Sequence, residues 1–346
     1  MTSTGRRKLA VVLFNLGGPD GPDDVRPFLQ NLFSDPAIIG LPGLIRRPLA
    51  AFIAARREQS AQANYALMGG GSPLLPETRK QAGALQDVLA DAADEVRVFI
   101  AMRYWRPFTE DAARDVAAFA PDDVVLLPLY PQFSTTTTAS SFKAWREAYA
   151  GPGRVHSVCC YPEAEGWIGA QVAAIGTQLA KAGDQPVRVL FSAHGVPESV
   201  IAERGDPYQA QIEAGAAAIA QAAGLSDWSI CYQSRVGPMK WLGPSTPEAI
   251  EQAGRDGVGV IIVPIAFVSE HIETLVELDI EYAHLAADLG VTPYLRAVTP
   301  GVAPAFVGAL AQAVRAAVET PGVRAFGPGC RADFAACPCR SEGAPA

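Results

Sequence analysis

The stretch that decides the fold is VRVLFSAHGVP, residues 187–197. A mostly apolar run with two valines, 187–191, is typical of a strand, and it is followed by two small residues and then His194. Continuous apolar strands belong to parallel sheets that are covered on both faces, and open α/β sheets bind ligands at the carboxyl ends of their strands. The stretch therefore predicts a buried parallel strand that carries an imidazole at a ligand-binding edge.

Outward from this strand, short apolar runs alternate with alanine-rich segments along most of the chain. We expect strands at 9–14, 96–102, 124–129, 187–191, 228–232 and 258–265, and helices at 76–93, 110–119, 166–182, 210–223, 247–253 and 304–319. This alternation predicts an α/β fold with doubly wound sheets. Because each half opens with a strand that ends in a functional-looking loop, we expect two similar Rossmann-like lobes with parallel sheets and a cleft between them.

A polar turn, Gly-Asp-Gln-Pro at 183–186, separates a long expected helix from the next expected strand. We therefore expect a first lobe over 1–183 and a second lobe, with His194 and an acidic helix, over 184–303. A C-terminal helix and a cysteine-rich tail would occupy 304–346.

Composition excludes several classes of protein. The 36 acidic and 28 basic residues give a net charge of −8, which argues against a nucleic-acid partner because phosphate neutralisation needs clustered Lys and Arg. The glycine clusters at 17–18 and 69–71 do not fit G-x-G-x-x-G between a strand and a helix, so we expect no nucleotide. The basic start at 6–8 precedes an apolar run that is short and lacks a cleavage site, which favours the cytoplasm.

A second informative stretch is SEHIETLVELDIE, residues 269–281. Glu273, Glu277 and Glu281 recur every four residues, so on an α-helix they lie along one face. Like charges at this spacing are unfavourable, and no basic residue is interleaved. The spacing indicates either a solvated acidic face or a path for a cation.

These stretches resemble those of ferrochelatase, the enzyme that inserts ferrous iron into a porphyrin to make haem. The resemblance also rests on FNLGGP (14–19), GGGSP (69–73), YPQFS (130–134) and YQSRVGP (232–238). It implies conversion of Fe²⁺ and protoporphyrin IX to protohaem with release of two protons. Alternative functions are metal insertion into coproporphyrin or another tetrapyrrole, and a non-catalytic haem or metal carrier.

The resemblance also implies roles for particular residues. His194 and Glu273 match the essential catalytic pair, as acceptors of the pyrrole protons or as ligands of the substrate Fe²⁺. Glu277, Glu281 and His271 would relay protons or metal. The residues that match the porphyrin pocket are Leu16, Arg57, Tyr65, Ser72, Arg103, Tyr130 and Phe267. Arginine suits propionate binding because its planar fork bonds both carboxylate oxygens.

The tail carries Cys330, Cys337 and Cys339 within ten residues. In a cytosolic protein three such thiols favour metal over disulfides, and both zinc and iron–sulfur sites call for a fourth thiolate. The resemblance implies a [2Fe–2S] cluster on these cysteines. The fourth ligand must come from Cys159, Cys160 or Cys231; we expect Cys159 or Cys160, because Cys231 is expected to be a buried strand residue.

Apolar residues at 36–45 and 48–55 are flanked by paired arginines at 46–47 and 56–57. Such a segment either dips into an anionic membrane interface or forms an amphipathic helix over a pocket. The resemblance favours a porphyrin-binding lip that makes transient contact with the membrane surface. We thus expect a cytoplasmic protein, peripheral on the inner membrane, that is a monomer or a homodimer.

Overall fold

The computed structural model describes residues 6–235, 237, 239–320, 322–326 and 334–339. The described chain divides into two compact units. The first unit draws on Met1–Tyr130, Ser134–Cys159 and Leu310–Arg324, and the second on Pro131–Phe133, Cys160–Ala309 and Ala325–Ala346. Each unit is built around its own sheet, with helices on the sheet faces, so the predicted α/β class is confirmed.

The sheet of the first unit has the strand order β2-β1-β3-β4-β9. Strands β1 to β4 pair in parallel, and β1 (Lys8–Asn15) is buried along nearly its whole length, as its apolar sequence predicts. The other strands are β2 (Glu95–Met102), β3 (Asp123–Pro128), β4 (Arg154–Cys160) and β9 (Val323–Ala325).

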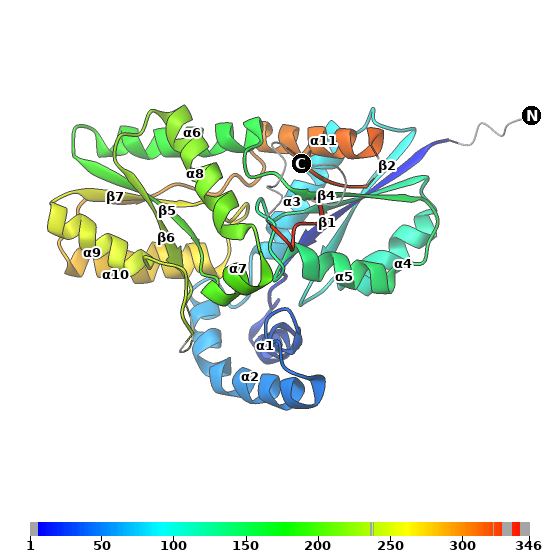
Figure 1. Cartoon of the computed structure of the whole chain (residues 1–346), viewed down its shortest axis with the longest axis horizontal. Helices are drawn as coiled ribbons and strands as arrows, with labels where there is room; N and C mark the ends of the chain where they lie inside the picture. Colours follow the sequence, from blue (N-terminus) through cyan, green and yellow to red (C-terminus); the bar gives the residue numbers. More distant parts are fainter. Residues whose placement is uncertain (1–5, 236, 238, 321, 327–333, 340–346) are drawn as a thin grey trace, which may run out of the picture. The chain divides into compact units, whose positions relative to one another are not determined.

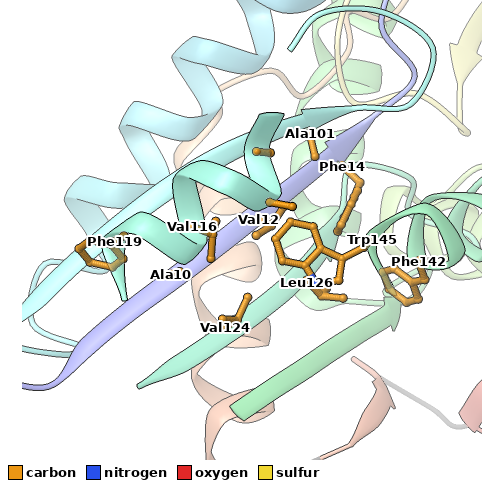
Figure 2. Packing of buried hydrophobic residues seen from close by; sticks show 12 residues of the cluster. Ala10, Val12, Phe14, Ala101, Val116, Phe119, Val124, Leu126, Phe142 and Trp145 are labelled. Atoms are coloured by element: carbon orange, nitrogen blue, oxygen red, sulfur yellow. The ribbon is translucent and has the colours of Figure 1, made fainter. Parts of the chain in front are cut away.

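Helices of the first unit include α4 (Thr109–Phe119) and α5 (Thr138–Ala148), which pack on the sheet through one apolar cluster (Figure 2). Its largest member, Trp145, is 1% exposed and makes an edge-to-face contact with Phe14 of β1, with ring centroids 6.0 Å apart. The remaining helices are η1 (Pro22–Asp24), α1 (Val25–Ser34), α2 (Gly43–Ala66) and α3 (Leu74–Val88). Helices α1 and α2 pack against each other.

The sheet of the second unit has the order β6-β5-β7-β8, with all strands parallel. Its strands are β5 (Val187–His194), β6 (Trp228–Gln233), β7 (Gly259–Pro264) and β8 (Tyr294–Arg296). Helices α6 and α8 lie on one side of this sheet and α9 and α10 on the other (Figure 1). These helices are α6 (Glu165–Ala182), α7 (Glu198–Arg204), α8 (Tyr208–Ala223), α9 (Thr246–Asp256) and α10 (Tyr282–Asp288).

All six expected strands and all six expected helices are present, most with ends shifted by a few residues. Three strands were missed. The first three residues of strand β4 include Arg154 and His156, so the apolar pattern typical of a strand is present only in its second half. Strands β8 and β9 have only three residues each. Strand β9 also lies in the segment 304–346, where we expected a helix and a cysteine-rich tail and no strand.

The expected lobe boundary at residue 183 differs from the division by contacts. That division assigns α6 to the second unit, because α6 packs against α8, β7 and β8. It also falls within α11 (Pro304–Glu319), between Ala309 and Leu310. The separate roles expected for 1–183, 184–303 and 304–346 stay predictions.

Candidate active site

His194 is the last residue of β5, the position that the sequence predicts for it. In the parallel ladder it pairs with Gln233 of β6, and the Gly195 N–H donates to the Gln233 carbonyl at 2.8 Å. The Tyr208 hydroxyl donates to the His194 carbonyl at 3.1 Å. The backbone on both sides of the imidazole is therefore fixed, while the His194 side chain stays 42% exposed.

The acidic segment is a π-helix over Glu273–Glu281, not the α-helix that the sequence predicts. It continues into α10. Pi-helical turns, with i→i+5 hydrogen bonds, are rare and frequently occur at functional sites. The four-residue spacing of the glutamates does not distinguish the two helix types, because it brings side chains to similar faces in both.

Glu273 reaches His194 directly. Its Oε2 lies 2.8 Å from His194 Nδ1. Burial alone would lower the pKa of His194, but the charge of Glu273 and this hydrogen bond raise it above its ordinary value. Burial would likewise raise the pKa of Glu273, yet His194, the charge of His271 and a hydrogen bond from Ser234 hold it well below its ordinary value. The structure thus brings the predicted catalytic pair together.

Glu277 lies four residues further along the π-helix and bonds Gln233 and Ser234 at the end of β6. It accepts hydrogen bonds from the Ser234 N–H at 2.8 Å, the Ser234 hydroxyl at 2.5 Å and the Gln233 side-chain amide at 3.0 Å. The Tyr282 hydroxyl donates a fourth bond at 2.7 Å. These contacts differ from what is expected of a solvated acidic face.

The other expected relay residues are placed differently. Glu281 is exposed, and partial desolvation of its carboxyl group together with the charge of Glu277 raises its pKa. His271 is buried, with Nδ1 3.0 Å from the Ser269 carbonyl and its ring edge-to-face with Phe267, an expected pocket residue. Glu270 is engaged by the Arg296 guanidinium at 3.0 Å.

In the first unit, three expected pocket residues lie at the carboxyl ends of neighbouring strands. Leu16 follows β1, Arg103 follows β2 and Tyr130 lies shortly after β3. The register joins the first two strands, because the Arg103 N–H donates to the Asn15 carbonyl at 2.9 Å. This edge is where an open parallel sheet binds ligands.

Arg103 is already engaged by a buried acid that sequence reasoning missed. Its Nη2 lies 2.7 Å from Oδ2 of Asp35, whose side chain is 3% exposed, and its Nε donates to the Ser140 hydroxyl at 2.8 Å. Asp35 also accepts from the Tyr104 hydroxyl at 2.9 Å. Two of the five guanidinium N–H groups thus bond Asp35 and Ser140.

The two glycine clusters pack on each other in the first unit. A Cβ on Gly18 would lie 2.5 Å from the Ser72 side chain, and a Cβ on Gly71 would lie 2.5 Å from the Asp20 carbonyl oxygen. The Ser72 N–H donates to the Pro19 carbonyl at 2.8 Å. The absence of a side chain at Gly18 and Gly71 therefore permits a close contact between these two loops.

Two further expected pocket residues lie on α2. Tyr65 is buried near the C-terminal end of this helix. Arg57 is exposed, and its guanidinium carbon lies 5.8 Å from the centre of the Phe33 ring.

Three cysteines form a group that can hold a metal centre. The sulfur atoms of Cys159, Cys337 and Cys339 lie within 4.8 Å of one another. Cys160 instead accepts a hydrogen bond from the Gln211 amide at 3.4 Å, and burial raises the pKa of Cys231 in β6 to about 11. Cys330 lies outside the described residues.

The N-terminal part of α2 exposes large apolar side chains. Leu44 is 94% exposed, Phe52 63% and Ile45 56%. Arg47 is exposed between them, and Arg46 donates to the carbonyls of Ser34 and Leu41. Within the part of the chain that the structure describes, no helix has the length and apolar character needed to cross a membrane.

Gln233, Ser234, Tyr208 and Asp35 contact the expected site residues but were not singled out from the sequence. A signal existed for the first two, because polar residues at the end of β6 must lie beside the end of β5 in a parallel sheet. No comparable signal marks Asp35, which lies 68 residues before the arginine it binds.

Comparison with solved structures defines the class of fold. The chain is similar to the sirohydrochlorin chelatase SirB from Bacillus subtilis subspecies spizizenii, solved with cobalt, with a TM-score of 0.50 and 12% identity over 91% of this chain and 97% of SirB. It is also similar to DR2241 from Deinococcus radiodurans, which has structural similarity to chelatases, with a TM-score of 0.50 and 16% identity over 90% of this chain and 55% of DR2241. The fold is therefore of the chelatase type.

Sequence comparison gives the family. The chain belongs to the ferrochelatase family, whose model matches residues 8–318. It is 61% identical to the ferrochelatase of Caulobacter vibrioides over 98% of this chain and 99% of that protein. It is 59% identical to the ferrochelatase of Phenylobacterium zucineum over 97% of this chain and 99% of that protein. The family expected from the sequence motifs is confirmed.

Proposed function

We propose that this ferrochelatase inserts Fe²⁺ into protoporphyrin IX, giving protohaem and two protons, with His194 and Glu273 as its catalytic residues. Membership of the family supports the reaction. The observation that carries the residue assignment is the 2.8 Å contact between His194 Nδ1 and Glu273 Oε2.

The chemistry requires a base beside the porphyrin, because two pyrrole N–H protons leave as the metal enters. When His194 Nδ1–H donates to Glu273, the lone pair of Nε2 is left to accept a proton. The carboxylate fixes this tautomer and stabilises the imidazolium that results. The same lone pair is suited to Fe²⁺, so a role of His194 as a ligand of the substrate iron is the second candidate.

The decisive experiment is an anaerobic assay with ferrous iron and excess protoporphyrin. We expect many equivalents of protohaem per chain from the wild type and none above background from His194→Ala, although this variant should still quench porphyrin fluorescence. Stoichiometric binding without turnover in the wild type would instead identify a carrier. Normal turnover by His194→Ala would remove the imidazole from the mechanism.

The choice of tetrapyrrole is tested in the same assay. Coproporphyrin has four propionates, and Arg103, one expected propionate partner, already shares its charge with Asp35. We therefore propose protoporphyrin as the preferred substrate. A larger kcat/KM with coproporphyrin would identify the alternative chelatase.

We further propose that Cys159, Cys337 and Cys339, with Cys330, hold a [2Fe–2S] cluster. The proximity of the three described sulfur atoms supports a shared metal centre, and thiolates are the usual ligands of such clusters. The proximity of the Cys159 sulfur atom to those of Cys337 and Cys339 favours Cys159 over Cys160 as the remote ligand, and the raised pKa of the buried Cys231 thiol disfavours Cys231.

Colour and metal content separate this cluster from zinc. Protein purified anaerobically should be reddish-brown, bleach with dithionite and contain about two iron and two sulfide per chain. Cys159→Ser and Cys330→Ser should each abolish the colour, whereas Cys160→Ser and Cys231→Ser should retain it. Colourless wild-type protein that contains zinc would contradict the cluster.

We also propose that the exposed apolar side chains of α2 insert into a membrane interface, which would place the protein on the cytoplasmic side of the inner membrane. Leu44 and Phe52 supply apolar contact and Arg47 a cation for anionic headgroups. Co-sedimentation with vesicles that contain phosphatidylglycerol should be lost in Leu44→Ser/Phe52→Ser. The exposed Val155→Ser is the control, and equal sedimentation of all three proteins would contradict the proposal.

A further inference from the structure

The carboxylate of Glu277 has its hydrogen-bonding capacity filled. Oε1 accepts from the Ser234 N–H and the Tyr282 hydroxyl, and Oε2 accepts from the Ser234 hydroxyl and the Gln233 amide. An ionised carboxylate offers about four lone-pair sites, two on each oxygen. All four are used, and the donors come from the last residue of β6, from Ser234 directly after it, and from Tyr282 of α10.

A carboxylate bonded in this way is poorly suited to carry a cation. Binding Fe²⁺ through Glu277 would require at least one of these donors to be displaced and left without an acceptor, which is costly. Glu281, by contrast, is exposed to solvent. The two glutamates therefore differ in what they can do, although they have the same spacing in the sequence.

Ser234 is the centre of this arrangement. Its φ of 59° lies in the left-handed region, which non-glycine residues rarely adopt without compensating contacts. In this conformation both its N–H and its hydroxyl face the π-helix, and the hydroxyl lies 2.5 Å from Glu277 Oε2 and 3.1 Å from Glu273 Oε2. The hydroxyl carries one proton, so the two carboxylates share it.

Gln233 ties the same arrangement to the strand of His194. Its side-chain amide donates to the Glu273 carbonyl at 3.1 Å and to Glu277, and its Oε1 accepts from the Ser192 hydroxyl of β5 at 2.8 Å. Gln233 itself is fully buried. The separation between the end of β5 and the start of the π-helix is therefore fixed by hydrogen bonds.

We propose that Glu277 and Ser234 are positioning residues that hold the Glu273 carboxylate against His194. Glu277 holds Ser234 in its left-handed conformation, and the Ser234 hydroxyl then fixes Oε2 of Glu273, the oxygen that bonds His194. This inference rests on the proposed roles of His194 and Glu273. It assigns Glu277 a fixed position instead of a part in carrying the metal.

Steady-state kinetics with Fe²⁺ and protoporphyrin distinguish a positioning residue from a metal carrier. We expect Ser234→Ala and Glu277→Gln each to lower kcat by about tenfold or more, because small misplacements of a catalytic group are costly. The KM for Fe²⁺ should stay within about twofold of the wild-type value. The double variant should be little worse than the poorer single variant, because the two residues act through one contact.

Three comparison variants complete the experiment. Ser234→Gly removes the hydroxyl but adopts positive φ freely, so its kcat should match that of Ser234→Ala if the hydroxyl is what matters. Glu277→Asp keeps a carboxylate and should recover part of the lost kcat. Glu251→Gln, at an exposed α9 carboxylate that pairs only with Arg255 at 3.6 Å among the interactions described, should behave as wild type.

The outcomes separate this inference from the proposed function. A raised KM for Fe²⁺ with unchanged kcat in Glu277→Gln would make Glu277 a metal carrier and overturn the inference, and so would fully additive losses in the double variant. Normal activity of Glu273→Gln would instead overturn the proposed catalytic pair. Porphyrin binding and the circular-dichroism melting curve of each variant show whether it is folded.

Discussion

The acid–base behaviour of the site depends on a single hydrogen-bonded pair, His194 and Glu273. The carboxylate favours the imidazolium, so the pKa of His194 lies above its ordinary value. An imidazole with a raised pKa is a stronger base, but it is free to accept a pyrrole proton only in the fraction of molecules where it is neutral. The pair therefore links catalytic strength to pH.

This link predicts the position of the acidic limb of the pH profile. The kcat/KM of the wild type should fall as the pH decreases through the raised pKa of His194, above the unperturbed value of about 6.5. Glu273→Gln removes the negative charge and should move the limb to lower pH while also lowering the maximum rate. Profiles measured anaerobically in matched buffers test this, and an unmoved limb would mean that another group controls it.

Glu281, an expected relay residue, should differ from Glu273 in its effect on kcat. Glu281 is exposed and lies beyond Glu277 from the catalytic pair, so Glu281→Gln should lower kcat several-fold less than Glu273→Gln. Equal and mild losses in both variants, measured in the same assay, would indicate that the π-helix is only a solvated acidic face.

At the scale of elements, parallel pairing places the site residues. The register of β5 with β6 sets His194 beside Gln233, and that of β1 with β2 sets Asn15 beside Met102, one residue before Leu16 and Arg103. Neighbouring strand ends therefore converge at the edge where such sheets bind ligands. Loop contacts such as Gly18 with Ser72 then fix the first unit's edge.

The tight loop contact predicts a steric effect on stability. Gly71→Ala would press a methyl group against the Asp20 carbonyl oxygen, and we expect it to lower the free energy of unfolding by about 1–3 kcal/mol. Gly83→Ala, in the exposed face of α3 with nothing near its Cβ, should raise it by about 0.5–1 kcal/mol. Urea titrations measure both. A neutral Gly71→Ala would show that the loops can separate at little cost.

At the scale of the whole molecule, a cluster on Cys159, Cys337 and Cys339 would join the tail to β4. A metal centre that binds only the folded chain stabilises it, so Cys337→Ser should melt several degrees below the wild type. His194→Ala, which keeps the cysteines, should melt with the wild type. Coincident melting of Cys337→Ser and wild-type protein in differential scanning calorimetry would argue against a structural metal centre.

Much of the architecture could be predicted from the sequence, because strands and helices are indicated by patterns of residues close together in the chain. Apolar runs such as 187–191 and 258–265 have the continuous pattern of buried parallel strands, and the alanine-rich runs between them identify the helices. The motifs around His194 and the glutamates also gave the family that the comparisons confirm. Strand β4 escaped detection, since Arg154 and His156 among its first residues break that local pattern.

The sequence by itself therefore determined the α/β class, the place of His194 at a strand end and the membership of the ferrochelatase family. The local spacing of the glutamates did not distinguish the observed π-helix from an α-helix. Only the tertiary structure decided that Ser234 and Gln233 bond the carboxylate of Glu277 and that Asp35 engages Arg103. The physical reason is the separation along the chain of the residues that interact. Strand and helix patterns depend on neighbours within a few residues, whereas each of these contacts joins groups more than 40 residues apart, whose distance is set by strand pairing and packing.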